Sequence, residues 1–216
     1  MIFVLGANGF VGSAFVRRLS NLNLPFIPVT RTNYTDYVGH PCRILINASG
    51  NSRKYLATRE PAHEFDLSVT SVLRAICDFR PARYVHLSSI DVYNDVSNPT
   101  NNCENVSIDP AHLSAYGFSK YMAELVVKHY APNWLILRLG GMVGPGLKKN
   151  PIYDLLHGGS LYVHPDSLYQ YVSTDRVAEI VFDLAQSNIR GEVFNLCGDT
   201  LISPRQVAGW LQRPDA

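Results

Sequence analysis

The segment Gly6-Ala-Asn-Gly9-Phe-Val-Gly12 constrains the fold of this chain more than any other feature. It follows the apolar run Ile2–Leu5, whose lack of polar alternation predicts a strand buried on both faces. It leads into residues 11–22, which have helical spacing of apolar side chains. A glycine-rich turn between a buried strand and a helix is typical of a dinucleotide site, where the helix N-terminus faces the phosphates. The predicted cofactor contacts here are Gly6, Asn8, Gly9, Phe10, Val11 and Gly12.

Strand and helix patterns continue to alternate along the chain. Strands are expected at residues 26–30, 43–47, 84–87, 134–137 and 193–196, and helices at 62–79, 116–130, 174–186 and 203–211. This order predicts an α/β fold, a Rossmann-type doubly wound parallel sheet within a single domain. Residues 1–140 would form the cofactor-binding core and residues 141–216 mostly a small C-terminal substrate lobe. Loops are expected at 140–146, and helix N-caps at Thr174 and Ser203.

Composition narrows the class of partner. The 216 residues carry a formal net charge of +1 without a basic or acidic block, which gives no electrostatic reason to expect nucleic acid or a membrane as partner. No apolar run is long enough to cross a bilayer and no charged leader precedes the first strand, so we expect a cytoplasmic protein. The scattered cysteines and histidines predict no metal site.

The residue after the second predicted strand bears on cofactor choice. An acidic side chain there would bind the adenosine ribose of NAD, but the chain has Val29-Thr-Arg31. A guanidinium at Arg31 could pair with the 2′-phosphate of NADP. We therefore favour NADP over NAD, with NAD as the alternative.

The segment Tyr116-Gly-Phe-Ser-Lys120 is the clearest candidate for chemistry. Residues i and i+4 share one helical face, so the phenol and the ammonium can point into one cleft. A neighbouring cation is expected to lower the tyrosine pKa from about 10 and make the phenol a proton shuttle for hydride transfer. The pair Ser88-Ser89 follows strand 84–87 and should emerge at the carboxyl edge of the sheet, where ligands bind.

Several longer segments match the motifs of one family. The glycine segment resembles G-x-x-G-x-x-G, Leu87-Ser-Ser-Ile-Asp-Val-Tyr93 resembles S-S-x-x-V-Y, and the stretch from Leu113 to Glu124 resembles P-x-S-x-Y-G-x-S-K-x-x-x-E. Asn47-Ala-Ser-Gly50 is similar to the segment that ends the third strand of this family, near the cofactor. In these segments the chain resembles the extended short-chain dehydrogenase/reductase family, the NAD-dependent epimerase/dehydratase group.

The resemblance implies residue roles. Tyr116 would be the general acid/base, Lys120 would hold the nicotinamide ribose and tune the phenol, and Ser89 would position the reacting oxygen. Further cofactor contacts would come from Ala48, Ser49, Gly50 and Leu87. Family members commonly dimerise through the helix that bears the Tyr–Lys pair and its neighbour, so the resemblance implies a homodimer.

Departures from the family pattern bear on the substrate. Gly141 and Val143 replace the asparagine and tyrosine of R-x-x-N-V-Y-G-P, a region that contacts substrate in sugar-nucleotide members. Ile90-Asp91 stands where dehydratases carry Asp-Glu, and because isoleucine cannot donate a proton, dehydration is disfavoured. Substrate contacts are expected at Asp91, Gly141 and Met142.

Together these features predict an NAD(P)-dependent oxidoreductase. It would transfer a hydride between NADP(H) and a carbonyl or alcohol of a small molecule, namely a sugar, a nucleotide sugar or a similar metabolite. One alternative is an NAD-dependent sugar epimerase with tightly bound cofactor. An alternative of another class is a non-enzymatic NADP-binding sensor.

Overall fold

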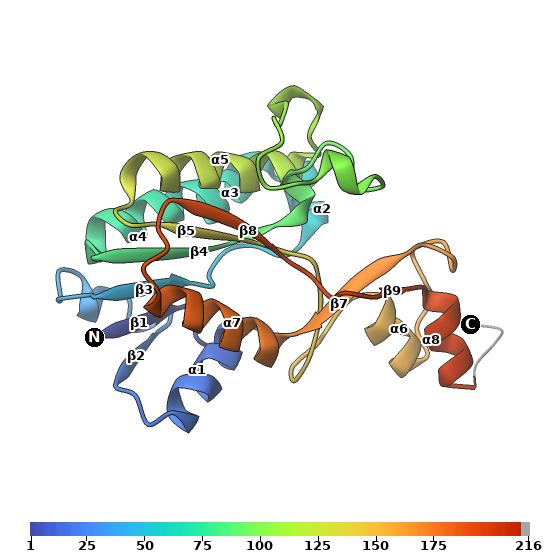
Figure 1. The fold of residues 1–216 in the computed structure, drawn as a ribbon, viewed down its shortest axis with the longest axis horizontal. Coiled ribbons are helices and arrows are strands. Elements are labelled where there is room, and N and C mark those ends of the chain that lie inside the picture. The colour runs from blue at the N-terminus through green and yellow to red at the C-terminus, as the bar shows by residue number, and fades with distance from the viewer. Residues whose placement is uncertain (213–216) are drawn as a thin grey trace.

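A six-stranded parallel sheet forms the centre of the computed structural model, which describes residues 1–212 (Figure 1). The strand order is β2-β1-β3-β4-β5-β8, and each neighbouring pair is parallel. The predicted doubly wound α/β fold is thus confirmed. The strands are β1 (Ile2–Leu5), β2 (Phe26–Val29), β3 (Ile44–Asn47), β4 (Arg83–Ser89), β5 (Leu135–Leu139) and β8 (Glu192–Leu196).

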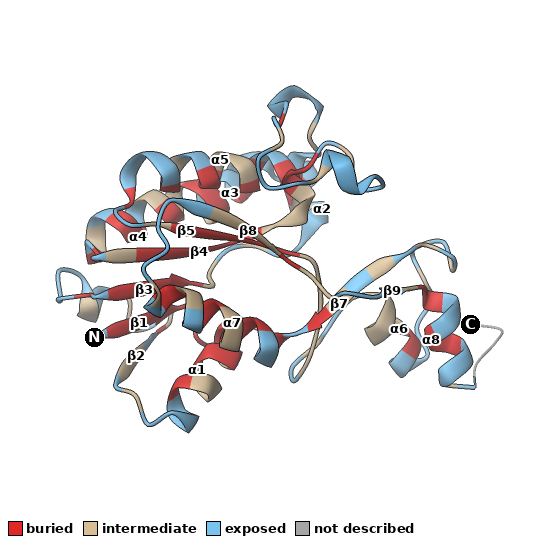
Figure 2. Cartoon of the chain, viewed as in Figure 1, coloured by how far each residue is buried: buried red, intermediate tan, exposed pale blue. Residues whose placement is uncertain are grey.

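Helices cover both faces of this sheet. The helices α1 (Gly12–Asn21) and α7 (Thr174–Gln186) lie on one face, and α4 (Ser71–Phe79) and α5 (Ala115–Tyr130) on the other (Figure 1). Alternate strand residues enter two hydrophobic clusters, one with each helix pair, so β1, β3, β4 and β5 are buried along most of their length, whereas the outer strands β2 and β8 are only partly buried (Figure 2). Each large apolar side chain that is fully buried contributes about 1.5–3 kcal/mol.

The connection between β2 and β3 determines where a ligand can bind. Residues 30–43 cross from the edge strand β2 over β1 to β3 and contain only one 3₁₀ turn, Thr35–Tyr37. In the Rossmann strand order 3-2-1-4-5-6, strand 3 lies outside strand 2 and forms the edge of the sheet. Here β2 is the edge, and the strand order still reverses between β1 and β3. Ligands bind outside the carboxyl ends of the strands at such a switch point.

The region predicted as one helix over 62–79 is divided in the structure. It consists of α3 (Pro61–Phe65), a π-helical turn (Asp66–Thr70) and α4, and a separate short helix, α2 (Lys54–Arg59), precedes it. Pro61 occupies the first turn of α3, where proline lacks no needed hydrogen bond. Because π turns keep the chain coiling in one direction, the apolar periodicity continues through the interruption. The spacing of apolar residues therefore gave no sign of the π turn.

After β5 the chain forms a small lobe beside the sheet (Figure 1). A second sheet of order β6-β7-β9 combines one parallel and one antiparallel pair. The predicted loop over 140–146 was partly wrong, because β6 pairs with β7 there. Both α7 and β8 return to the main sheet, so the described lobe is smaller than residues 141–216. Its elements are β6 (Gly141–Val143), α6 (Pro151–His157), β7 (Tyr169–Ser173), β9 (Leu201–Ile202) and α8 (Pro204–Trp210).

The two predicted N-caps had different outcomes. Ser203 accepts a hydrogen bond from the Gln206 backbone N–H and completes a capping box for α8, as predicted. The prediction of Thr174 as an N-cap was wrong, because the cap of α7 is Ser173, whose Oγ accepts from the Arg176 backbone N–H at 3.1 Å. A serine and a threonine in succession offer two equivalent caps, and only burial of the second distinguishes them.

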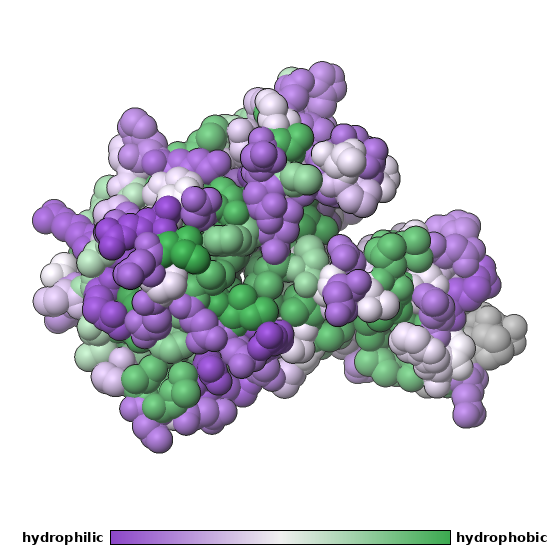
Figure 3. Space-filling view, in the orientation of Figure 1, coloured by the Kyte–Doolittle hydropathy of each residue, from purple (hydrophilic) through white to green (hydrophobic). Residues whose placement is uncertain are grey.

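The surface adds two observations. In the view of Figure 3, hydrophobic residues gather in the middle of the face and on the lobe, with polar and charged residues around them. Within residues 1–212, no helix combines the length and the apolar character needed to cross a lipid bilayer.

Candidate active site

The switch point brings two loops into contact at the carboxyl ends of β1 and β3. Gly6, the first residue after β1, has a φ of 78°, and a Cβ atom there would lie 2.8 Å from the Ala48 carbonyl oxygen. Only glycine combines that backbone conformation with so close an approach. The two predicted cofactor segments, one after each strand, are therefore adjacent in space.

The start of α1 suits an anionic group. The predicted residues Asn8, Gly9, Phe10 and Val11 form the connection from β1, and no side chain caps the helix at Val11. A helix N-terminus without a side-chain cap presents backbone N–H groups and the positive end of the helix dipole. Gly12 is the first residue of α1. The chemistry of this turn fits the pyrophosphate of a dinucleotide.

Arg31 lies at the edge of this region. It is exposed and follows the end of β2 by two residues, in a turn where the Thr30 backbone N–H donates to Asn33 Oδ1 at 2.7 Å. Its side chain is therefore open to solvent beside the carboxyl end of β2. Its predicted contact with a 2′-phosphate stays a prediction.

The end of β4 supplies a hydroxyl and a carboxylate. Ser89 donates from Oγ to Asp91 Oδ2 at 2.8 Å and accepts from the Asp91 backbone N–H at 3.2 Å. This exchange caps the 3₁₀ turn Ile90–Val92, which follows the strand directly. Leu87, two residues earlier, is buried in the core of the sheet. The strand therefore fixes the position of the Ser89 hydroxyl, which Asp91 holds.

Helix α5 brings the Tyr–Lys pair to the same place. Ser114 caps its start by accepting from the Gly117 backbone N–H at 3.0 Å. A Cβ atom at Gly117 would lie 2.2 Å from the Asp91 carbonyl oxygen, so a glycine is needed for the helix to pack on the 3₁₀ turn. Tyr116 and Lys120 are buried, with 8% and 7% exposed.

The Lys120 ammonium lies between the phenol and the cofactor loop. Its Nζ is 5.4 Å from the centroid of the Tyr116 ring and 3.3 Å from the place of a Cβ on Gly50. Ser49 donates from its backbone N–H and its Oγ to Asn47 Oδ1, which fixes the loop after β3. The structure thus unites the segments around residues 48–50, 89 and 116–120 that the sequence places far apart.

The predicted effect on the Tyr116 pKa was wrong for the free protein. Burial, followed by the charges of Asp91 and Glu64, raises the pKa of Tyr116 well above its usual range. Burial also lowers the pKa of Lys120, an effect that the same two carboxylates oppose. The sequence shows the neighbouring cation but not the desolvation, and desolvation has the larger effect. The resting phenol is therefore protonated at neutral pH.

Two charged residues at this site were missed by the sequence analysis. Lys54, the first residue of α2, donates from Nζ to Asp91 Oδ1 at 2.6 Å and lies 5.8 Å from the Tyr116 ring centroid. Glu64 is fully buried and accepts from Asn51 at 2.5 Å and from Ser68 Oγ at 2.6 Å. Glu64 stood out only as an acidic residue within an apolar helical pattern, and Lys54 gave no signal.

A buried histidine lies beneath the site. His86 on β4 is 2% exposed, and neither ring nitrogen has a hydrogen-bond partner among the described residues. Burial, with a smaller effect of Lys120, lowers the pKa of His86 to about 3. The imidazole is therefore neutral at physiological pH, and its ring stacks on Tyr84.

The predicted substrate residues of the lobe lie in β6. Gly141 pairs with Tyr171 of β7, and a Cβ on Gly141 would lie 2.8 Å from the Gln170 carbonyl oxygen. Met142 packs against the core on the side of α1 and α7. The structure explains the glycine by close strand packing, and a contact of either residue with substrate stays a prediction.

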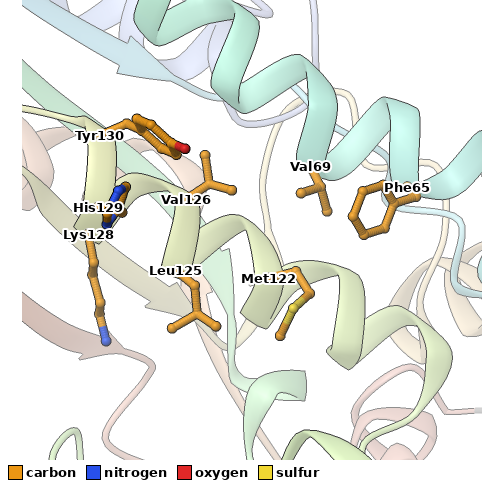
Figure 4. Close-up of a pocket in the computed structure, with 8 residues that line it drawn as sticks. All are labelled: Phe65, Val69, Met122, Leu125, Val126, Lys128, His129 and Tyr130. Atoms are coloured by element: carbon orange, nitrogen blue, oxygen red, sulfur yellow. The ribbon is translucent and has the colours of Figure 1, made fainter.

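A hollow lies away from these residues, on the outer face of α5 (Figure 4). Apolar side chains dominate its lining, and Phe65, Leu125 and Tyr130 are exposed. The lining residues are Phe65, Val69, Met122, Leu125, Val126, Lys128, His129 and Tyr130. It contains none of the predicted catalytic or cofactor residues and is a separate surface feature.

Comparison with known proteins decides the family. The model of the NAD-dependent epimerase/dehydratase family matches residues 2–197. The chain belongs to the NAD-dependent epimerase/dehydratase family. This confirms the resemblance inferred from the motifs, and the chain is an NAD(P)-dependent enzyme of this family that uses a nicotinamide cofactor. A comparison with curated protein sequences found no match.

Solved structures share the fold of this family member at low identity. MoeE5 in complex with UDP-glucuronic acid and NAD is 21% identical, with a TM-score of 0.83 over 96% of this chain and 80% of that chain. DesIV, a dTDP-glucose 4,6-dehydratase from Streptomyces venezuelae with NAD and TYD bound, is 22% identical, with a TM-score of 0.76 over 97% of this chain and 79% of that chain. RMD from Pseudomonas aeruginosa complexed with NADPH is 19% identical, with a TM-score of 0.77 over 98% of this chain and 85% of that chain.

Proposed function

We propose that this family member transfers a hydride between NADP(H) and a carbonyl or alcohol of a small molecule. The substrate class is a sugar, a nucleotide sugar or a similar metabolite. The observation that carries the proposal is the convergence of Tyr116, Lys120 and Ser89 beside the loop after β3, with both α5 side chains buried. A buried Tyr–Lys pair at the carboxyl edge of a parallel sheet is suited to move a proton where a ligand binds.

The residues divide the chemistry among them. The nicotinamide cofactor supplies or accepts the hydride when bound, and the glycine turn at Gly6 and the segment Ala48-Ser-Gly50 would hold it. Tyr116, protonated at rest, donates its proton to the carbonyl oxygen in the reducing direction. Lys120 stabilises the phenolate that remains, and Ser89 donates a hydrogen bond to the reacting oxygen once it releases Asp91.

Cofactor preference rests on Arg31. Its exposed guanidinium beside β2 supports NADP, because a bidentate cation recognises the 2′-phosphate. The named complexes of similar fold include both NAD and NADPH, so the fold accommodates either. A thermal-shift comparison of NADPH and NADH tests the preference. NADPH should give the larger rise in melting temperature, and Arg31→Met should remove the difference.

An epimerase is the second candidate, favoured by the family match itself. It would use the same phenol and ammonium to oxidise and re-reduce one substrate. Conversion without net consumption of added cofactor distinguishes it from a reductase. UDP-glucose, UDP-glucuronic acid and dTDP-glucose form the first panel, because solved structures of MoeE5 hold UDP-glucose or UDP-glucuronic acid and DesIV is a dTDP-glucose 4,6-dehydratase.

We further propose a homodimer formed through the outer face of α5. Exposed Phe65, Leu125 and Tyr130 around the hollow of Figure 4 form an apolar surface on the helix that carries Tyr116 and on its neighbour. Contiguous apolar patches of this kind mark interaction sites. The family resemblance points to a second copy of the chain as the partner.

Tyr116→Phe tests the proposed function. Removal of the proton donor should lower kcat about 10²–10⁴-fold and leave the cofactor-induced rise in melting temperature intact. Tyr121→Phe on the same helix is the matched control and should retain turnover. Unchanged turnover of Tyr116→Phe would remove this residue from its role. A protein that binds cofactor but turns over no substrate would favour the non-enzymatic sensor.

A further inference from the structure

An exposed cation, Lys54, lies beside the catalytic residues without a role in the proposed hydride transfer. The Lys54 side chain is 66% exposed, yet its Nζ approaches both Asp91 and the Tyr116 ring. Its position at the start of α2 places the ammonium on the solvent side of the phenol. A molecule that reaches Tyr116 from solvent therefore passes close to this charge.

A second cation reaches the same place from the lobe. Lys149, in the connection between β6 and α6, donates from Nζ to the Ser52 carbonyl oxygen. This contact joins residues 97 positions apart and links the lobe to the loop before α2. Burial, followed by the charges of Lys54 and Arg53, lowers the pKa of Lys149. The three cations are therefore close enough to repel one another.

The charges around Lys54 do not balance. Three cations, Arg53, Lys54 and Lys149, lie near one another, and the Asp91 carboxylate that pairs with Lys54 balances one of them, which leaves an excess of two positive charges. Including Lys120 and Glu64 beneath them adds one charge of each sign and leaves the excess unchanged. Like charges held together cost free energy that a bound anion would recover. The excess positive charge on the loop and the lobe is thus suited to an anion.

The distances define which part of a ligand would carry the anion. Lys54 Nζ lies 5.8 Å from the Tyr116 ring centroid. An anion about 2.8 Å from that nitrogen would lie within roughly 9 Å of the ring. A group within that distance is close enough to the phenol to be attached to the reacting part of a small substrate.

We propose that the substrate carries a carboxylate or phosphate group a few bonds from the reacting carbon, and that Lys54 and Lys149 bind it. This inference rests on the proposed function, because it takes Tyr116 as the reacting centre. It narrows the substrate class to sugars that bear a carboxylate or phosphate of their own, in addition to any nucleotide diphosphate that they carry. Both sources share one chemistry, an oxyanion bound by two ammonium groups.

The test is a calorimetric titration of the cofactor-loaded protein with inorganic phosphate, D-glucuronate and D-glucose. Bound cofactor fills the glycine turn, so that phosphate cannot bind there. Both anions should bind at least tenfold tighter than D-glucose. Lys54→Met and Lys149→Met should each weaken anion binding at least fivefold. Tighter binding of phosphate than of D-glucuronate would indicate a sugar phosphate, and the reverse order a sugar acid.

Lys148→Met is the matched control, because it removes the same charge one residue earlier in the same exposed loop. It should change anion affinity less than twofold. Equal affinity for D-glucose and the anions would overturn the proposal, as would equal weakening by Lys148→Met, which would indicate a diffuse basic surface. Failure of NADP and NAD to raise the melting temperature would instead contradict the proposed function. Titrations of the cofactor-free protein and its lysine variants with D-glucuronate and D-glucose would then still decide the anion site.

Discussion

Two adjacent serines at the end of β4 belong to different environments. Ser88 donates to Glu124 Oε1 at 2.6 Å, and Arg138 binds both oxygens of that carboxylate at 3.0 and 2.8 Å. The side chains of this ion pair are 2% and 0% exposed. Ser89 donates instead to Asp91, whose partner Lys54 is 66% exposed. The strand alternation directs one hydroxyl into the interior and the other to the cleft.

The two networks differ in whether they are complete. Arg138 also donates to Tyr93 at 2.9 Å, and Tyr93 donates to Asn195 at 2.7 Å, so the inner network satisfies its charges within the fold. The outer network has an excess of cations and a hydroxyl held by a single carboxylate. A complete buried network holds the strands and helix together, whereas an incomplete exposed one can exchange its partners for a ligand. The inner serine should therefore serve stability and the outer one chemistry.

The largest expected effect comes from breaking the inner network. Glu124→Gln leaves the Arg138 guanidinium buried without a counter-charge and should lower the free energy of unfolding by about 3–5 kcal/mol. Urea denaturation measures this loss. Asp91→Asn removes the carboxylate charge of the exposed pair and should cost less than about 1 kcal/mol. Similar losses in both variants would show that the two networks do not differ as described.

A smaller effect concerns pH and the neutral His86. In the unfolded chain this imidazole gains a proton below about pH 6.5, whereas in the folded protein its pKa is about 3. The unfolded state therefore binds more protons as pH falls. The free energy of unfolding should fall by about 3 kcal/mol between pH 7 and pH 4.5 from this residue alone. His86→Phe should lose less stability over that range in urea titrations, and an identical loss would contradict the assignment.

What the sequence could predict follows from how local each signal is. The glycine turn and the spacing of Tyr116 and Lys120 are short patterns whose geometry depends on one turn or one helix, and the structure places them as expected. The parallel sheet followed from repeated alternation of strand and helix. Helix ends were less certain, because Ser173 and Thr174 can both cap and only tertiary packing decides.

What it could not predict depends on contacts between distant residues. The partners Lys54 and Asp91 are 37 positions apart, and no local pattern indicates that α2 folds back over the cleft. The direction of the Tyr116 pKa shift depends on burial, which α5, the 3₁₀ turn and the loop after β3 create together. The neighbouring Lys120 was visible in the sequence, but the desolvation that outweighs it was not.

The most direct test exchanges each adjacent serine for alanine and compares unfolding with turnover. Ser88→Ala should lower the free energy of unfolding by about 1.5–3 kcal/mol, because it removes a hydrogen bond to a buried carboxylate, and should leave kcat unchanged. Ser89→Ala should lower kcat about 100-fold and change stability by less than about 1 kcal/mol. The reverse pattern, with turnover lost in Ser88→Ala and kept in Ser89→Ala, would contradict the account.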